Sequence, residues 1–132
     1  MKDCIFCQII KKRANVHIVD ENENVIVFMS LENHPIIVTK KHIPNIYLLD
    51  NKIASDVMIE TVKIAKAVKK AFKCDGVNII QSNGIAAGQD VFHFHLHVKP
   101  RLYKDKVVLS WNNQIKSDKM RKKMSEAIKK EL

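Results

Sequence analysis

The segment from Val91 to Val98, Val-Phe-His-Phe-His-Leu-His-Val, constrains the fold more than any other part of the chain. Histidines alternate with large apolar residues, and a period of two is typical of a half-buried β-strand. In such a strand His93, His95 and His97 share one face. Imidazole titrates near neutral pH, acts as a nucleophile and binds metals, so three aligned imidazoles indicate a site of chemistry. The opposite face would pack into the core through Phe92, Phe94, Leu96 and Val98.

One interpretation is a single metal ion bound by all three histidines, but strand geometry argues against it. At a rise of about 3.3 Å per residue, His93 and His97 lie roughly 13 Å apart. Zinc–nitrogen bonds are only about 2.0–2.1 Å long. One ion can therefore bind two neighbours at most, and another histidine must have a different role.

The remaining patterns predict an α+β fold with a mainly antiparallel sheet and one long helix. From Asn51 to Lys73 apolar residues recur at helical spacing with lysines between them, which indicates an amphipathic helix. Ser117-Asp118 can cap a final helix that reaches Leu132. Short turns between strands favour antiparallel pairing. We expect a helical turn at 5–12 and strands at 16–19, 25–29, 35–39, 77–81 and 91–98, with an acidic turn at 20–24 and Gly76 ending the long helix.

The chain has 132 residues, which suits one domain, assigned here to residues 1–103, and a basic C-terminal extension, 104–132. Residues 1–103 hold 14 Lys and Arg against 10 Asp and Glu, whereas residues 104–132 hold 9 against 4. Such a tail could attract polyphosphate or nucleic acid, but a solvated helix face is the interpretation that we favour.

The chain carries no pattern that predicts membrane association. Its longest apolar runs, such as Val25–Met29, are far too short to span a bilayer, and its first residues lack the apolar stretch of a signal peptide. Three cysteines, an odd number, favour reduced thiols. We therefore expect a cytoplasmic protein.

The segment Gly88–Val98 resembles the His-x-His-x-His signature of the histidine-triad (HIT) superfamily. The resemblance extends to Asn83-Gly84, to Lys40-Lys41-His42 and to Cys4-Ile5-Phe6-Cys7, and it covers roughly residues 4–103 in the expected order. The chain is most similar to the small histidine-triad nucleotide-binding proteins. The resemblance implies a purine nucleotide or nucleotide conjugate as ligand, and a homodimer paired through the long helix and edge strands.

The resemblance also implies a mechanism in which His95 is the nucleophile. Its neutral nitrogen would attack the α-phosphorus of a nucleotide, and water would then release the nucleoside monophosphate from the nucleotidyl-histidine. His97 would donate to a phosphate oxygen or handle the leaving-group proton, a role suited to a group that titrates near pH 7. In this family a backbone carbonyl commonly orients the other nitrogen of the nucleophile.

Substrate-binding residues follow from matched positions. The loop 81–90 would hold the phosphate through backbone N–H groups and the amides of Asn83 and Gln89, with Gly88 and Asp90 beside them. His34 matches a further histidine near the phosphate. Ser30 stands where relatives have an acidic residue that binds both ribose hydroxyls, so ribose recognition is weaker here or supplied from elsewhere. An apolar base pocket, whose members equally suit an ordinary core, would consist of Ile5, Phe6, Phe28 and Leu31.

The spacing Cys4-x-x-Cys7 by itself fits a redox pair or two unpaired thiols. Relatives with this N-terminal motif often bind structural zinc. The resemblance implies that His42 and His93 complete a closed Cys₂His₂ site with no position for water. His93 would then hold the metal while His95 and His97 face substrate.

Together these features predict a phosphoramidase-like nucleotidyl hydrolase that cleaves at the α-phosphate of purine nucleoside 5′-phosphoramidates. A dinucleoside polyphosphate hydrolase is the alternative within the enzyme class, because the ending Val98-Lys99-Pro100-Arg101 also resembles that branch. A zinc-stabilised nucleotide-binding protein with incidental catalysis is the alternative from another class. A nucleic-acid-binding module that uses the basic tail is less favoured.

Overall fold

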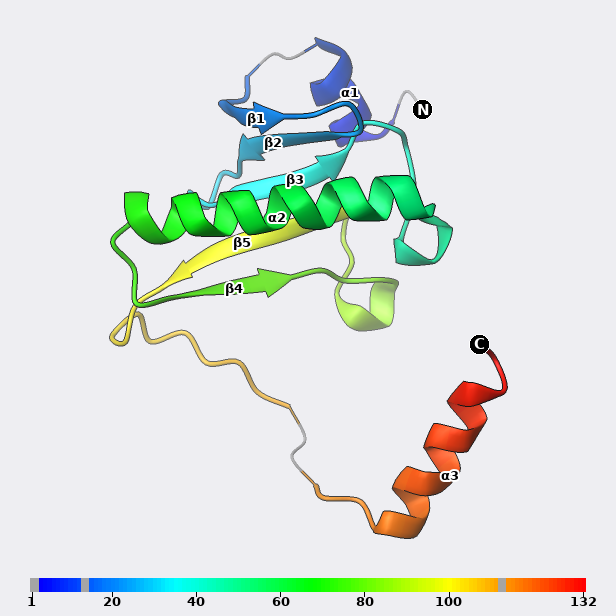
Figure 1. Ribbon diagram of the computed structural model, residues 1–132. Helices are drawn as coiled ribbons and strands as arrows, with labels where there is room; N and C mark the ends of the chain where they lie inside the picture. Colours follow the sequence, from blue (N-terminus) through cyan, green and yellow to red (C-terminus); the bar gives the residue numbers. More distant parts are fainter. Residues whose placement is uncertain (1–2, 13–14, 112–113) are drawn as a thin grey trace.

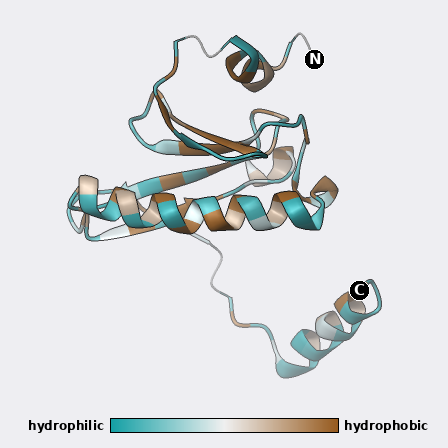
Figure 2. Ribbon diagram, turned by 45° about the horizontal axis from the view of Figure 1, so that its top comes forward, coloured by the Kyte–Doolittle hydropathy of each residue, from teal (hydrophilic) through white to brown (hydrophobic). Residues whose placement is uncertain are grey.

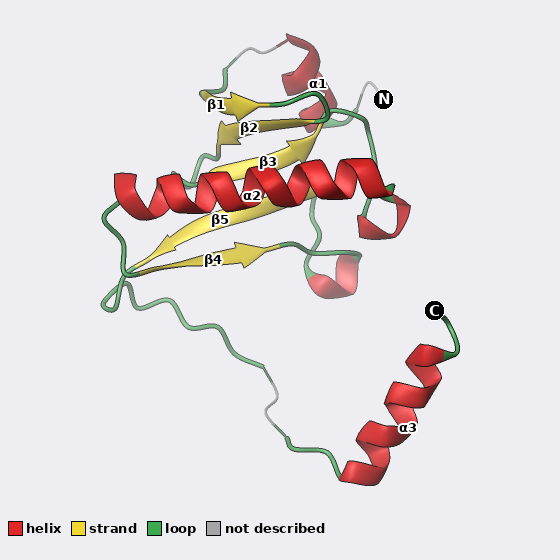
Figure 3. Cartoon of the chain, viewed as in Figure 1, coloured by secondary structure: helices red, strands yellow, loops and turns green. Residues whose placement is uncertain are grey.

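The computed structural model describes residues 3–12, 15–111 and 114–132. It contains an antiparallel sheet of five strands in the order β1-β2-β3-β5-β4, with the long helix α2 running across one face (Figures 1 and 3). The predicted α+β architecture, with its antiparallel sheet and one long helix, is confirmed. The strands are β1 (Ile18–Glu21), β2 (Val25–Met29), β3 (Pro35–Thr39), β4 (Gly76–Ile80) and β5 (His95–Arg101), and the α-helices are α1 (Ile5–Lys12), α2 (Asn51–Ala71) and α3 (Asp118–Lys129).

Helix α2 begins where Asp50 caps it, because the Asp50 carboxylate accepts a hydrogen bond from the Ile53 backbone N–H at 2.8 Å. Lys73 adopts a left-handed conformation with φ of 50°, which ends the helical segment earlier than predicted. Gly76 is instead the first residue of β4. Lysines interrupt the apolar character of α2, and no helix in the described part of the chain is both long and apolar enough to cross a membrane.

Two apolar clusters cover the two faces of the sheet. Alternate residues of β2 and β3 point to opposite sides, as the pleat of a strand requires. Val25, Val27 and Ile37 pack with the buried face of α2, while Ile26 and Phe28 pack with Phe6 of α1. Strands β2 and β3 are therefore buried on both faces, and the histidine strand β5 is hydrogen-bonded next to β3.

Strand β1 differs from the expected range 16–19, because it runs from Ile18 to Glu21. Its pairing with β2 slips between Ile18 and Asp20, where the register shows an irregularity typical of a bulge. The acidic turn therefore begins after Glu21 rather than at Asp20. Val16 lies outside the strand and packs against the cluster under α1.

The C-terminal extension leaves the sheet after β5 and ends in α3, which stands apart from the sheet (Figures 1 and 2). Ser117 caps α3 as predicted, its hydroxyl accepting a hydrogen bond from the Met120 backbone N–H at 3.2 Å. The helix ends at Lys129, short of the expected Leu132. Met120, Met124 and Ile128 recur every fourth residue and are exposed, so α3 presents an apolar stripe to its surroundings.

Candidate active site and metal centre

Strand β5 starts at His95 rather than at Val91, so residues 91–94 approach it outside the ladder. Here the Phe94 backbone N–H donates to the Ile43 carbonyl at 2.6 Å. Phe94, Leu96 and Val98 enter the core as predicted, but the side chain of Phe92 is 47% exposed. The prediction that Phe92 packs in the core is wrong, because residues 91–93 form a bend in which the alternation of a strand is lost, whereas Phe94 directly precedes the strand and keeps it.

His93, His95 and His97 lie on the side of the sheet that faces α1. The Phe6 ring centroid is 5.9 Å from that of His93 and 5.1 Å from that of His95. The rings of His95 and His97 are also 5.1 Å apart. The three imidazoles therefore form one row, with Phe6 of α1 packed against its first two members.

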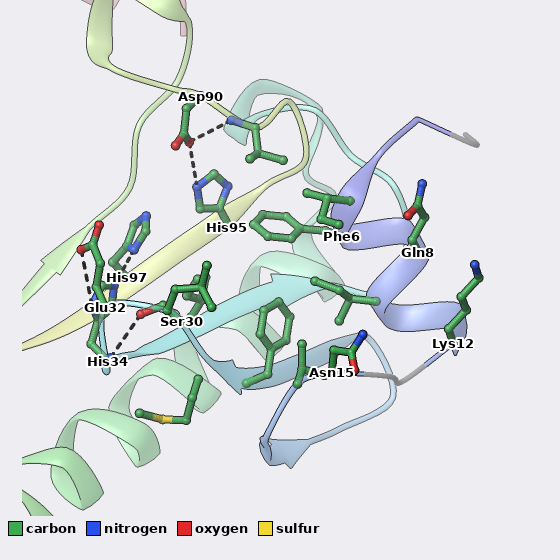
Figure 4. A pocket seen from close by; sticks show the side chains of 18 residues that line it. Phe6, Gln8, Lys12, Asn15, Ser30, Glu32, His34, Asp90, His95 and His97 are labelled. Atoms are coloured by element: carbon green, nitrogen blue, oxygen red, sulfur yellow. Dashed lines mark hydrogen bonds and ion pairs between the residues drawn. The ribbon is translucent and has the colours of Figure 1, made fainter.

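A backbone carbonyl fixes the tautomer of His95. The Nδ1–H group of His95 donates to the His93 carbonyl oxygen at 2.7 Å, which leaves the lone pair on Nε2. This Nε2 faces the pocket, where the Asp90 Oδ1 atom lies 3.8 Å away (Figure 4). The orientation matches the one expected for a nucleophilic histidine.

His97 is hydrogen-bonded to His34, with 2.8 Å between His97 Nδ1 and His34 Nε2. The Glu32 carboxylate lies 4.0 Å from His34 Nδ1 and favours a proton on that nitrogen, which makes Nε2 of His34 the acceptor. His97 then donates through Nδ1, and its Nε2 carries a lone pair. Burial of the His34 ring, and secondly the charge of Lys99, lower the pKa of His34.

The pKa of His97 is lowered to about 4, chiefly by burial and secondly by the neighbouring His95 and His34. The expectation that this group titrates near pH 7 is therefore wrong for the pocket without substrate. His97 is neutral at pH 7, where it offers Nε2 as an acceptor. A phosphate anion placed beside this ring would favour its charged form and raise the pKa of His97.

A pocket of about 540 Å³ opens in front of these histidines. His34, His95 and His97 lie at one end, and Gln8, Lys12 and Asn15 lie at the other (Figure 4). The apolar walls between the two ends include Phe6, Ile9, Val16, Phe28 and Ile36. The predicted substrate-binding residues that line this pocket are Ile5, Phe6, Phe28, Ser30, Leu31, His34 and Asp90.

The side chains of Asn83 and Gln89 are used in hydrogen bonds that fix the loop 81–90, which precedes the histidine segment. Gln89 Nε2 donates to the Pro44 carbonyl at 2.7 Å, and its Oε1 accepts from the Gly84 backbone N–H at 2.8 Å. Asn83 Oδ1 accepts from the Ile46 backbone N–H at 2.8 Å. Among the residues that the structure describes, Asn83, Gly88 and Gln89 do not line the pocket. Direct contact between them and a phosphate stays a prediction.

Sequence reasoning missed Glu32, which a tight turn brings to the pocket wall. The Asn33 backbone N–H donates to the Ser30 carbonyl at 3.1 Å, and the Ser30 hydroxyl accepts from the His34 backbone N–H at 3.2 Å. The Glu32 carboxylate then lies 4.0 Å from His34 Nδ1 and 3.4 Å from Lys99 Nζ. The one signal in the sequence is a carboxylate in the short loop that follows Ser30.

Cys4, Cys7, His42 and His93 form a cluster whose four ligand atoms all lie within 4.8 Å of one another. Cys7 Sγ is 3.2 Å from His42 Nδ1, and Cys4 Sγ is 3.4 Å from His93 Nδ1. Zinc bonds of about 2.0–2.3 Å in a tetrahedron separate neighbouring ligand atoms by about 3.3–3.8 Å. The Sγ–Nδ1 separations of 3.2, 3.4 and 3.6 Å are therefore close to those of a tetrahedral zinc site.

Two further features of this cluster suit a cation. His93 Nε2–H donates to the Thr39 carbonyl at 2.7 Å, which directs the lone pair of Nδ1 toward the thiols. Burial, followed by the adjacent Cys4 thiol, raises the pKa of Cys7. A bound divalent cation would instead lower the pKa of these thiols, because it stabilises the thiolate form directly. Two thiolates and two imidazoles are a donor set that zinc prefers, so the residues present fit the metal.

Comparisons with known proteins agree with this geometry. The HIT domain family matches residues 11–103. "Protein hit" of Bacillus subtilis is 36% identical over 104 residues, which cover 76% of this chain and 72% of that protein. The adenosine 5′-monophosphoramidase of Saccharomyces cerevisiae is 33% identical over 116 residues, which cover 84% of this chain and 71% of the yeast enzyme.

Solved structures are similar over nearly the whole chain. A crystal structure of a HIT family protein from Bacillus anthracis has 32% identity and a TM-score of 0.91, covering 98% of this chain and 97% of that one. A zinc-bound histidine triad family protein from Mycobacterium smegmatis has 28% identity and a TM-score of 0.75, covering 86% of this chain and 85% of that one. With its sequence, its sheet and its row of histidines in agreement, this chain belongs to the HIT family.

Proposed function

We propose that the protein is a nucleotidyl hydrolase that cleaves purine nucleoside 5′-phosphoramidates at the α-phosphorus through a nucleotidyl-His95 intermediate. The observation that carries this proposal is the 2.7 Å hydrogen bond from His95 Nδ1 to the His93 carbonyl, which leaves Nε2 unprotonated at the pocket. The yeast relative, an adenosine 5′-monophosphoramidase, supports the substrate class.

In the first step, the Nε2 lone pair of His95 attacks the α-phosphorus and a phosphorus–nitrogen bond forms. The bond between phosphorus and the leaving amine breaks, and the amine carries away its electron pair. His97, protonated while the phosphate anion lies beside it, gives its Nε2 proton to the departing nitrogen. His34 keeps the ring of His97 in place through the bond to Nδ1.

In the second step, a water molecule attacks the phosphorus of nucleotidyl-His95. The water gives a proton to Nε2 of the now neutral His97, and the bond between His95 and phosphorus breaks. His95 recovers its lone pair, and the products are a nucleoside monophosphate and an amine. His97 ends the cycle with the proton that it donated in the first step.

The pocket supplies matching contacts for the rest of the nucleotide. The rings of Phe6 and Phe28 pack edge to face, with centroids 5.9 Å apart, and together form an apolar wall that suits one face of a base. Ser30 and Glu32 line the same pocket at its histidine end, near His34 and His97 (Figure 4), and the Glu32 carboxylate can accept from ribose hydroxyls. Glu32 thus provides the acidic group that Ser30 does not.

Turnover of adenosine 5′-phosphoramidate, with diadenosine tetraphosphate run alongside, tests the proposed function. We expect release of AMP from the phosphoramidate, measured by chromatography of the products. Cleavage of the dinucleotide alone would favour the dinucleoside polyphosphate hydrolase. Nucleotide binding without turnover of either compound would make the chain a zinc-stabilised nucleotide-binding protein.

We further propose that two copies of the chain form a homodimer through α2 and the free edge of β4. Met58, Ile59 and Val62 are exposed on the outer face of α2, and Ile79 is exposed on β4. β4 is the last strand of the sheet, so one of its edges carries backbone groups without a neighbouring strand in the described chain. An apolar helix face beside an open strand edge suits a self-complementary interface.

The molar mass in solution tests the dimer. We expect light scattering after size exclusion to give twice the 15.2 kDa of one chain. Val62→Asp should shift the population to single chains, because the substitution places a charge in the proposed interface. Met124→Asp is the matched control, since it removes a similar apolar side chain from α3. A wild-type mass of 15.2 kDa at micromolar concentration would refute the dimer.

A further inference from the structure

One face of α1 lines the pocket along its whole length. Ile5, Gln8, Ile9 and Lys12 all line it, and their spacing of three, four and seven residues places them on the same side of the helix. Phe6, next to Ile5, packs on His95, so this end of α1 lies at the nucleophile. At 1.5 Å per residue, Lys12 lies about 10 Å further along the axis. That separation suits a nucleotide extended from its phosphate to the outer edge of its base.

The chemical character of the pocket changes along this direction. Phe6, Ile9, Val16 and Phe28 form its apolar middle, which suits a purine ring. Beyond them the Lys12 ammonium and the Asn15 amide form a polar outer end, opposite His95 and His97 in Figure 4. A base whose ring lies in the apolar part presents its outer edge to Lys12 and Asn15.

The ammonium group distinguishes purines by what they carry at position 6. Lysine offers hydrogen-bond donors and no acceptor. Guanine and hypoxanthine present two acceptors, O6 and N7, on this edge, whereas adenine presents an amino group beside N7. Lys12 therefore forms a favourable contact with a 6-oxo group and an unfavourable one with a 6-amino group. Asn15 can donate or accept, so it accommodates either base.

We propose that Lys12 is a specificity-determining residue that selects 6-oxopurine nucleotides over adenine nucleotides. This inference rests on the proposed function and names its preferred substrate class, conjugates of guanosine or inosine 5′-monophosphate. Lys12 lies far from the reacting phosphorus, so its contact is the same in the ground state and the transition state. Its effect therefore falls on binding and KM rather than on kcat.

Dissociation constants of GMP, IMP and AMP, measured by calorimetry, test the inference without relying on turnover. We expect the wild-type protein to bind GMP and IMP about fivefold more tightly than AMP. This ratio is at the lower end of the discrimination that side-chain contacts to base edges provide, because Lys12 is exposed. Lys12→Met should make the three affinities equal. Lys12→Glu should reverse the order, because a carboxylate accepts from the 6-amino group of adenine.

Lys11→Met is the matched control, since Lys11 is the neighbouring lysine in the last turn of α1 but does not line the pocket. Its loss weakens attraction for all three nucleotides alike and keeps their ratio. Equal wild-type affinities, an unchanged ratio in Lys12→Met, or IMP that binds like AMP would each overturn the inference while the proposed hydrolase stands. Binding of none of the three nucleotides, together with no phosphoramidate cleavage, would instead overturn the proposed function itself.

Discussion

We expect replacement of His95 with alanine to lower kcat/KM for adenosine 5′-phosphoramidate by at least about 10⁴-fold, because the substitution removes the proposed nucleophile. The carbonyl of His93 directs the lone pair of His95 to Nε2, so in the proposed mechanism His95 supplies the attacking atom in the required orientation. We expect AMP to bind the variant with an affinity similar to that of the wild type, since the walls of the pocket remain. Steady-state kinetics and calorimetry separate the two effects.

His17→Ala is the control for this prediction. His17 is exposed, is not among the residues that line the pocket, and contributes its backbone carbonyl to the Met29 N–H, a bond that survives the substitution. Its kcat/KM should stay within about twofold of wild type, as is usual for surface substitutions. Turnover by His95→Ala above one per cent of the wild-type rate would be incompatible with a nucleotidyl-His95 intermediate.

Loss of the metal is the second large effect that we expect. The wild-type protein should contain one zinc ion per chain, measured by mass spectrometry of the metal, and Cys7→Ala should contain none. Because an ion bound by these four residues would join α1 to the segments around His42 and His93, we expect its loss to lower Tm by at least about 10 °C. The variant should also have a higher KM, since α1 supplies Phe6 and Ile5 to the pocket.

Cys74→Ala provides the comparison. Cys74 is buried in the cluster under α2, far from the proposed ligands, so its replacement should keep the zinc content and lower Tm only slightly. Wild-type protein that is purified with zinc in every buffer and still contains none would refute the proposed site. Equal Tm values for Cys7→Ala and wild type would show that the metal does not stabilise the fold.

The sequence predicted well those parts of the fold that depend on local patterns. The amphipathic spacing between Asn51 and Lys73 identified α2, and the apolar run Pro35–Thr39 identified β3 with the bounds observed. These patterns are reliable because a helix face or a buried strand must be apolar wherever it packs. The end of α2 was less predictable, because Lys73 adopts a left-handed conformation without being a glycine.

The site was predicted only in part, because much of it depends on contacts between distant segments. The row of histidines was evident, but the point where β5 begins depends on its pairing with β3, so Phe92 was misplaced. Glu32 reaches the pocket through a four-residue turn that no local pattern specified. Gln89 carries an amide that could bind phosphate, yet the Pro44 carbonyl and the Gly84 N–H occupy it. For Phe92 and Gln89 a tertiary partner decided the outcome.

His93 serves two neighbours through two different parts of one residue: its ring belongs to the cysteine cluster, and its backbone carbonyl holds His95. Mutation can replace the ring but cannot remove the carbonyl. In evolutionary terms, the capacity to bind a metal and the orientation of His95 can therefore be inherited separately. A lineage descending from this sequence can lose the proposed metal site by changing a single codon, and later fill the space with apolar side chains. Throughout that history, the orientation of His95 remains encoded by the path of the main chain alone.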